Sequence, residues 1–191
     1  MTYNPDKHHR HSIRLKDYDY SQAGAYFVTI CTWQRECIFG EIVAGEMVLN
    51  DTGRIVLAEW DKTPTMRPNA ELDRFVIMPN HLHGIIVLHN IVGAHCMRPY
   101  HDNIEQQNRV HISAPLQRQS GSIGSIIAGF KDATTKQINQ LISNPGCSVW
   151  QKNYYERVIR NEDELSRARE YIVNNPLKWE MDKENPVNSL E

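Results

Sequence analysis

Three features are scarce in this sequence of 191 residues: paired cysteines, long apolar runs and basic charge. The four cysteines form no Cys-x-x-Cys pair, so they indicate reduced structural thiols rather than a zinc or redox motif. No apolar run approaches the roughly 20 residues of a membrane-spanning helix. Residues 1–14 are polar and rich in histidine, which is not the pattern of a secretory leader. We therefore expect a cytoplasmic protein with no membrane partner.

The net charge of −2 and the pI near 6.5 argue against a protein that holds nucleic acid by a strong basic excess. The length and the 40% apolar content are ordinary for a globular protein and predict a single domain over residues 1–191. Within it we expect an irregular N-terminal arm over residues 1–20. We also expect a long exposed loop over residues 90–120, where polar residues gather and periodicity is lost.

The apolar pattern predicts four core strands, three helices and a small hairpin. The strands are expected at 25–33, 72–78, 81–88 and 149–159, the helices at 51–63, 123–141 and 162–174, and the hairpin pieces at 37–39 and 47–49. Without the hairpin and the last helix, this is the split βαβ order. We therefore predict an α+β fold with a ferredoxin-like antiparallel sheet and helices on one face, plus a small N-terminal hairpin and a C-terminal helix that carries Tyr171.

His81 and His83 form a pair in the sequence His-Leu-His at the start of a predicted strand. Alternate side chains of a strand share a face, so both imidazoles point one way and Leu82 points the other way. Two neutral imidazoles are good ligands for a divalent ion and leave coordination positions open for water and substrate, as a catalytic metal requires. Two surface histidines on a half-exposed strand are the simpler alternative.

Tyr171 and Asn175 stand four residues apart on the last predicted helix, so they share one of its faces. A tyrosine hydroxyl, with an ordinary pKa near 10, is a poor nucleophile until a metal or a base assists its deprotonation. A nearby metal would give that assistance. The alternative is that Tyr171 extends the apolar stripe of Leu165, Ala168 and Ile172 into the core.

Four segments together resemble the REP-associated tyrosine transposases, which belong with the single-tyrosine insertion-sequence transposases in the HUH endonuclease superfamily. The segments are VIMPNHLHGIIV (76–87), SIGSIIAGFK (122–131), WQKNYYE (150–156) and REYIVNNP (169–176). The resemblance extends roughly from Ser12 to Trp179, and the ordered set is more specific than any one of its members.

The resemblance implies a single-strand DNA endonuclease and strand transferase that acts in DNA transposition. It implies a Mg or Mn ion on His81 and His83, and attack by Tyr171 on a DNA phosphate to give a 5′-phosphotyrosine link and a free 3′-hydroxyl. Related insertion-sequence enzymes carry a further ligand, a glutamine, at the position of Asn175. Asparagine is one methylene shorter and here stands directly before Pro176, so this ligand position stays open. The implied partner is single-stranded DNA with palindromic hairpins, and a homodimer in which Tyr171 serves the other subunit is an open alternative.

Basic side chains are the natural contacts to DNA phosphates. The residues predicted for this role are Lys131, Lys136, Arg157, Arg160, Arg167 and Arg14. Tyr154 and Tyr155 compete with Tyr171 as nucleophiles, but their strand-like setting favours packing or base stacking. Two other functions remain open: a non-catalytic DNA-binding relative of a transposase, and a metal-dependent hydrolase that uses activated water on a small substrate.

Overall fold

The structure is a computed structural model that describes residues 18–90 and 121–189. Its centre is a four-stranded antiparallel sheet in the order β4-β5-β1-β6, formed by β1 (Gly24–Cys31), β4 (Ala70–Met78), β5 (His81–Leu88) and β6 (Tyr155–Ile159). A separate hairpin consists of β2 (Gly40–Val43) and β3 (Glu46–Leu49). The helices are α1 (Asp51–Asp61), α2 (Thr63–Met66), α3 (Ile123–Leu141) and α4 (Glu162–Asn174), with short 3₁₀ helices η1 (Trp33–Arg35), η2 (Pro176–Met181) and η3 (Pro186–Ser189).

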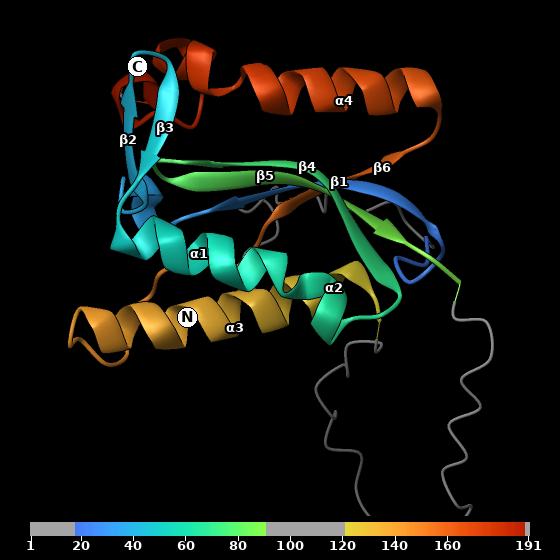
Figure 1. Cartoon of the computed structure of the whole chain (residues 1–191), viewed down its shortest axis with the longest axis horizontal. Coiled ribbons are helices and arrows are strands. Elements are labelled where there is room, and N and C mark those ends of the chain that lie inside the picture. Colours follow the sequence, from blue (N-terminus) through green and yellow to red (C-terminus); the bar gives the residue numbers. More distant parts are fainter. Residues whose placement is uncertain (1–17, 91–120, 190–191) are drawn as a thin grey trace, which may run out of the picture.

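The sheet separates the helices into two layers: α1 and α3 cover one face, and α4 runs along the other (Figure 1). Tyr26, Val28 and Ile30 of β1 are fully buried in the core cluster with α1 and α3. The residues between them point toward α4, because side chains alternate along a strand. Without the hairpin and α4 the element order is the split βαβ order, so the predicted ferredoxin-like α+β fold is confirmed.

Side-chain caps define where the long helices begin. The Asn50 side chain accepts a hydrogen bond from Gly53 N at 2.9 Å at the start of α1, and Asn161 accepts one from Glu164 N at 2.8 Å at the start of α4. Glu164 does not return the bond to the Asn161 amide, as a regular capping box would. Its carboxylate accepts from Arg160 N at 3.1 Å instead.

The largest differences from the predicted strands are in the hairpin and in the last strand. The hairpin turns at Ala44 and Gly45, whose φ angles of 51° and 80° are both positive as a two-residue turn requires, so residues 37–39 precede the hairpin rather than form its first strand. The last strand covers only Tyr155–Ile159, not 149–159. Trp150 still forms an isolated antiparallel bridge with Thr32, so the pairing with β1 is interrupted between Trp150 and Tyr155. Within this interruption Lys131 Nζ donates to the backbone carbonyls of Gln151 (2.8 Å) and Asn153 (3.0 Å).

The predicted loop at 90–120 and the N-terminal arm at 1–20 fall almost wholly outside the described residues, and Arg14 lies outside them as well. Over the ranges that are described, none of the helices combines the length and the apolar character that a bilayer crossing demands.

Candidate metal and tyrosine site

His81 and His83 lie side by side on the face of the sheet that α4 covers. β5 is paired on both sides, to β1 and to β4, so the backbone that carries the two histidines is held along its whole length. Their ring centroids are 4.4 Å apart, and the residues are 0% and 2% exposed. Leu82 between them is fully buried in the core on the opposite face. The shared face predicted from His-Leu-His is therefore observed, and the histidines are not surface residues.

Asn80 fixes the orientation of the His81 ring. Its amide nitrogen donates to the backbone carbonyls of Arg35 (3.0 Å) and Glu184 (2.7 Å), so its amide oxygen is the acceptor for His81 Nδ1 at 2.8 Å. The Nδ1 atom must then carry the proton, and the lone pair of Nε2 is free for a ligand. On the neighbouring strand, Thr29 Oγ1 stands 2.8 Å from His83 Nδ1, which is compatible with the same tautomer for His83.

Asp182, in the segment after α4, completes a cluster of atoms that can bind a cation. The ligand atoms of His81, His83 and Asp182 all lie within 4.8 Å of one another. Within residues 18–90 and 121–189, His81 Nε2, Asp182 Oδ2 and Asn175 Oδ1 are buried and find no hydrogen-bond partner. Leaving such atoms unsatisfied costs about 1–3 kcal/mol each, and more for a charged group. A divalent cation would satisfy imidazole, carboxylate and amide together, so the donor set fits a metal.

The electrostatics of the cluster favour neutral histidines and a protonated tyrosine in the absence of a cation. Burial lowers the pKa of His81 to about 4, although the Asp182 carboxylate acts in the opposite direction. Burial and the neighbouring His81 hold the pKa of His83 well below its ordinary value. Burial, together with the Asp182 charge, raises the pKa of Tyr171. Both imidazoles are thus ready to act as ligands near neutral pH, whereas the Tyr171 hydroxyl needs assistance to ionise.

Tyr171, on α4, reaches His83 of the histidine pair. Its hydroxyl is 3.4 Å from His83 Nε2, and the two rings meet edge to face at 5.1 Å. The side chain is 41% exposed, whereas Ile172, next to it, is buried, so Tyr171 is not part of the apolar stripe. Against the larger effect of burial in each case, the Asn175 side chain acts to raise the pKa of His81 and to lower the pKa of Tyr171, so its amide lies close to both groups. This position agrees with the prediction that Tyr171 and Asn175 share a face.

A pair between Arg169 and Asp73 attaches α4 to the sheet. The guanidinium of Arg169 donates to both carboxylate oxygens of Asp73 on β4, with Nε at 3.1 and 3.0 Å and a terminal nitrogen at 2.5 Å. This fork geometry is specific in direction as well as favourable. Because Arg169 stands two residues before Tyr171, the pair restricts where the tyrosine can lie over the sheet.

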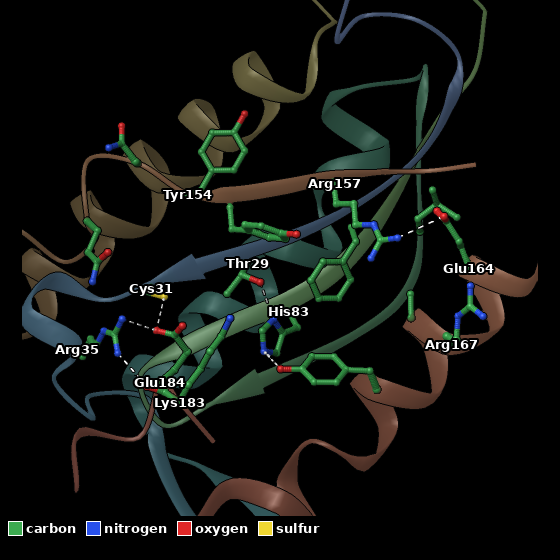
Figure 2. Close-up of a pocket in the computed structure, with 17 residues that line it drawn as sticks. Thr29, Cys31, Arg35, His83, Tyr154, Arg157, Glu164, Arg167, Lys183 and Glu184 are labelled. Atoms are coloured by element: carbon green, nitrogen blue, oxygen red, sulfur yellow. Dashed lines mark hydrogen bonds and ion pairs between the residues drawn. The ribbon is translucent and has the colours of Figure 1, made fainter. Parts of the chain in front are cut away.

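A cavity of about 670 Å³ opens beside Tyr171, between the sheet and α4. Of the predicted DNA contacts, Arg157 and Arg167 line this cavity (Figure 2). Lys131 instead holds the backbone before β6, Lys136 is exposed on α3 behind the sheet, and Arg160 is exposed just before α4. Their contacts with DNA stay predictions.

Three residues of the site, Asp182, Asn80 and Thr29, were not predicted from the sequence. Asp182 follows Pro176 in a stretch without periodicity, so no pattern indicates that its carboxylate returns to β5. Asn80 does carry a signal, because it directly precedes His81 in the turn between two strands. Thr29 lies in alternation with Cys31 on a predicted strand, but only the register of β1 against β5 brings it opposite His83.

Comparisons with known proteins agree with this architecture. No protein-family model matches the chain. A protein of Haemophilus influenzae, described only as an uncharacterized protein, is 42% identical over 181 residues, which cover 95% of this chain and 96% of the relative. The solved structure of a REP-associated tyrosine transposase bound to a REP hairpin aligns over 89% of this chain and 76% of its own chain, with a TM-score of 0.53 and 19% identity. The two chains share a fold.

Proposed function

We propose that this chain is a transposase-type single-strand DNA endonuclease and strand transferase. The premise is that the chain belongs to the same family as the Haemophilus influenzae protein and shares the fold of the REP-associated tyrosine transposase. One observation carries the proposal: the Tyr171 hydroxyl stands 3.4 Å from His83 Nε2, beside buried ligand atoms that lack partners among the described residues. A nucleophile and a cation site therefore meet at one point of an open cavity.

In the proposed reaction, Tyr171 Oη attacks the phosphorus of a DNA phosphodiester. The new bond joins Oη to phosphorus, and the bond from phosphorus to the 3′ oxygen breaks. The phenol proton leaves to solvent through the open cavity, and the departing 3′ oxygen takes up a proton to become a hydroxyl. The product is a 5′-phosphotyrosine, and its reversal by another 3′-hydroxyl transfers the strand.

His81, His83 and Asp182 are the proposed ligands of a divalent ion, Mg or Mn, with Asn175 as a fourth. When bound, the ion polarises the phosphate and assists ionisation of the tyrosine. The chain itself supplies orientation: Asn80 holds His81, Thr29 faces His83, and the Arg169 pair holds α4. The proposed ligand atoms themselves are buried, so bulk water reaches the Tyr171 side chain but not these atoms.

Single-stranded DNA with palindromic hairpins is the proposed partner, because the solved transposase of this fold holds a REP hairpin. Arg157 and Arg167 are the proposed DNA contacts at the cavity. DNA transposition is the proposed process. Cytoplasmic location and a homodimer stay predictions.

The test incubates the protein with labelled single-stranded hairpin oligonucleotides, in Mn²⁺ and in chelator, and looks for a protein–DNA adduct by denaturing gel and mass spectrometry. We expect a metal-dependent adduct at Tyr171 that is absent in Tyr171→Phe and in His81→Ala. Tyr18→Phe is a matched control that keeps the adduct. Binding without any adduct would favour the non-catalytic DNA-binding relative, and metal-dependent turnover that survives Tyr171→Phe would favour the hydrolase.

A further inference from the structure

The cavity beside Tyr171 is larger than an attacking tyrosine and one phosphate require. Its volume of about 670 Å³ lies within the range of roughly 300–1,000 Å³ that is usual for sites that hold a whole small molecule. It extends from His83 and Tyr171 to the outer edge of the sheet, where β6 forms the last strand. This outer part is not used by the proposed metal and nucleophile.

Aromatic rings line the way from the metal site to the edge of the sheet. Phe27 on β1 stacks on His83 at a centroid distance of 5.4 Å and meets Tyr171 edge to face at 6.0 Å. On its other side Phe27 meets the ring of Tyr155 on β6, at 6.4 Å. Tyr155 is 40% exposed and lines the cavity, so its ring is presented to a ligand rather than buried in the core.

Charged groups stand around this aromatic surface. Arg157 projects from β6 and Arg167 from α4, on opposite sides of the outer cavity (Figure 2). Glu164, at the beginning of α4, forms an ion pair with Arg157 at 3.3 Å. A guanidinium and a carboxylate held side by side present donors and an acceptor at once, which matches the polar edge of a nucleobase. The second guanidinium is suited to a phosphate.

We propose that the outer cavity, formed by Phe27, Tyr155, Arg157, Glu164 and Arg167, binds one unpaired nucleotide adjacent to the phosphate that Tyr171 attacks. The inference rests on the proposed function and assigns a base to a specific site. The base stacks on Tyr155 and Phe27, the Arg157–Glu164 pair meets its edge, and Arg167 contacts a flanking phosphate. Rings that present a π-face accept every base, as in other sites for single-stranded nucleic acid.

We expect an unpaired base, rather than a base pair, to enter this site. The site lies between a sheet face and the overlying helix α4, so a base that enters it must leave its own stack. Unstacking is least costly in single-stranded DNA. The subsite thus accounts for a preference for single strands through the aromatic rings rather than through net charge, which is −2 for the chain.

The experiment measures binding of a short single-stranded oligothymidylate with one central 5-iododeoxyuridine, in chelator and at low salt, so that no cleavage occurs. We expect Tyr155→Ala to weaken binding roughly 5- to 150-fold, the loss for one stacked base. Tyr155→Phe keeps the ring and should bind within about twofold of the unmodified protein. Trp33→Ala is the matched control, because Trp33 is 42% exposed, close to the 40% of Tyr155, and lies outside the cavity lining.

Photocrosslinking of the same complex identifies the residues that touch the base. We expect the crosslink to map to Tyr155 or Phe27 by mass spectrometry. The single variant Phe27→Leu should also weaken binding of the oligonucleotide, as Tyr155→Ala does. Wild-type affinity in Tyr155→Ala, crosslinks only to other residues, or no binding of the oligonucleotide would each overturn the subsite. A Tyr171 adduct that forms normally in Tyr155→Ala would overturn the subsite and leave the nuclease proposal intact. Tyr155-dependent binding by a protein that never forms the adduct would support the subsite and refute the nuclease.

Discussion

Replacement of Asp182 by asparagine distinguishes two roles for this carboxylate, that of a metal ligand and that of a structural group. Asp182 Oδ2 is buried 3.9 Å from His81 Nε2 and has no hydrogen-bond partner within the described residues. Without a cation, this charge faces imidazoles that burial keeps neutral, an arrangement that disfavours folding. Asparagine has nearly the same shape and no charge. In chelator, Asp182→Asn should therefore be at least as stable as the unmodified protein.

With metal the order should reverse. A ligand at about 100 times its Kd stabilises the folded state by about 2.7 kcal/mol. For a protein of this size, each kcal/mol raises Tm by about 2–4 °C, so saturating Mn²⁺ should raise Tm of the unmodified protein by about 5–11 °C. If loss of the carboxylate weakens affinity about 100-fold, the same Mn²⁺ concentration stabilises the variant by only about 0.4 kcal/mol, or about 1 °C.

Differential scanning fluorimetry across a Mn²⁺ titration measures both effects. Asp132→Asn is the matched control, since Asp132 is exposed on α3, away from the cluster, and this variant should keep the full shift. An Asp182→Asn protein with the same Mn²⁺-induced rise as the unmodified protein would exclude Asp182 as a ligand. A variant already destabilised in chelator would mean that the carboxylate is structural.

Three further predictions concern the residues around the site. Asn80→Ala removes the acceptor that orients His81 and should weaken Mn²⁺ binding about 10- to 100-fold, measured by isothermal titration calorimetry; unchanged affinity would refute the orienting role. Gly84→Ala should destabilise the fold by about 1–3 kcal/mol in urea denaturation, because the added Cβ would stand 2.6 Å from the Trp60 ring, whereas Gly129→Ala on the exposed side of α3 should be neutral or stabilising by up to about 1 kcal/mol. Arg169→Ala should lower the free energy of unfolding only slightly near neutral pH, since the pair is partly exposed. The hydrogen bonds from Arg169 lower the pKa of Asp73 below its ordinary 3.8, so the stability that the pair contributes is present above pH 3.8 and is lost as the pH falls below it. A difference in the free energy of unfolding between Arg169→Ala and the unmodified protein that persists in urea titrations at lower pH would contradict the assignment.

The fold could be predicted because its signals are local. The alternation around His81 and His83 and the apolar periodicity of 123–141 each depend on near neighbours in sequence, and each is found in the structure. The strand predicted at 149–159 is interrupted between Trp150, which still bridges to Thr32, and Tyr155, and Lys131, about 20 residues earlier in the chain, binds two carbonyls of that interval. No local pattern records such a contact.

The site was predictable in part for the same reason. The shared face of His81 and His83 and that of Tyr171 and Asn175 follow from strand and helix periods. The approach of Tyr171 to His83 depends on how α4 docks on the sheet, and the arrival of Asp182 depends on the path of η2. Both are tertiary relations between segments 88 or more residues apart, which periodicity does not encode. The motif resemblance implied that Tyr171 acts beside the histidines, but it did not indicate Asp182.

Both histidines lie on β5, a strand that is paired on each side. The face of the sheet on which they lie therefore depends on the register of β5, which a shift by one residue would reverse. Insertion or deletion of one residue in the turn at Pro79 and Asn80 would turn Leu82 toward the cavity and press the imidazoles against Trp60 and its neighbours. Neither the insertion nor the deletion would be tolerated, because both place the polar imidazole rings in the apolar core. Changes of chain length in this turn should therefore be far less tolerated than in the hairpin at Ala44 and Gly45, and a library of single-residue insertions would reveal that contrast as loss of soluble protein rather than loss of activity alone.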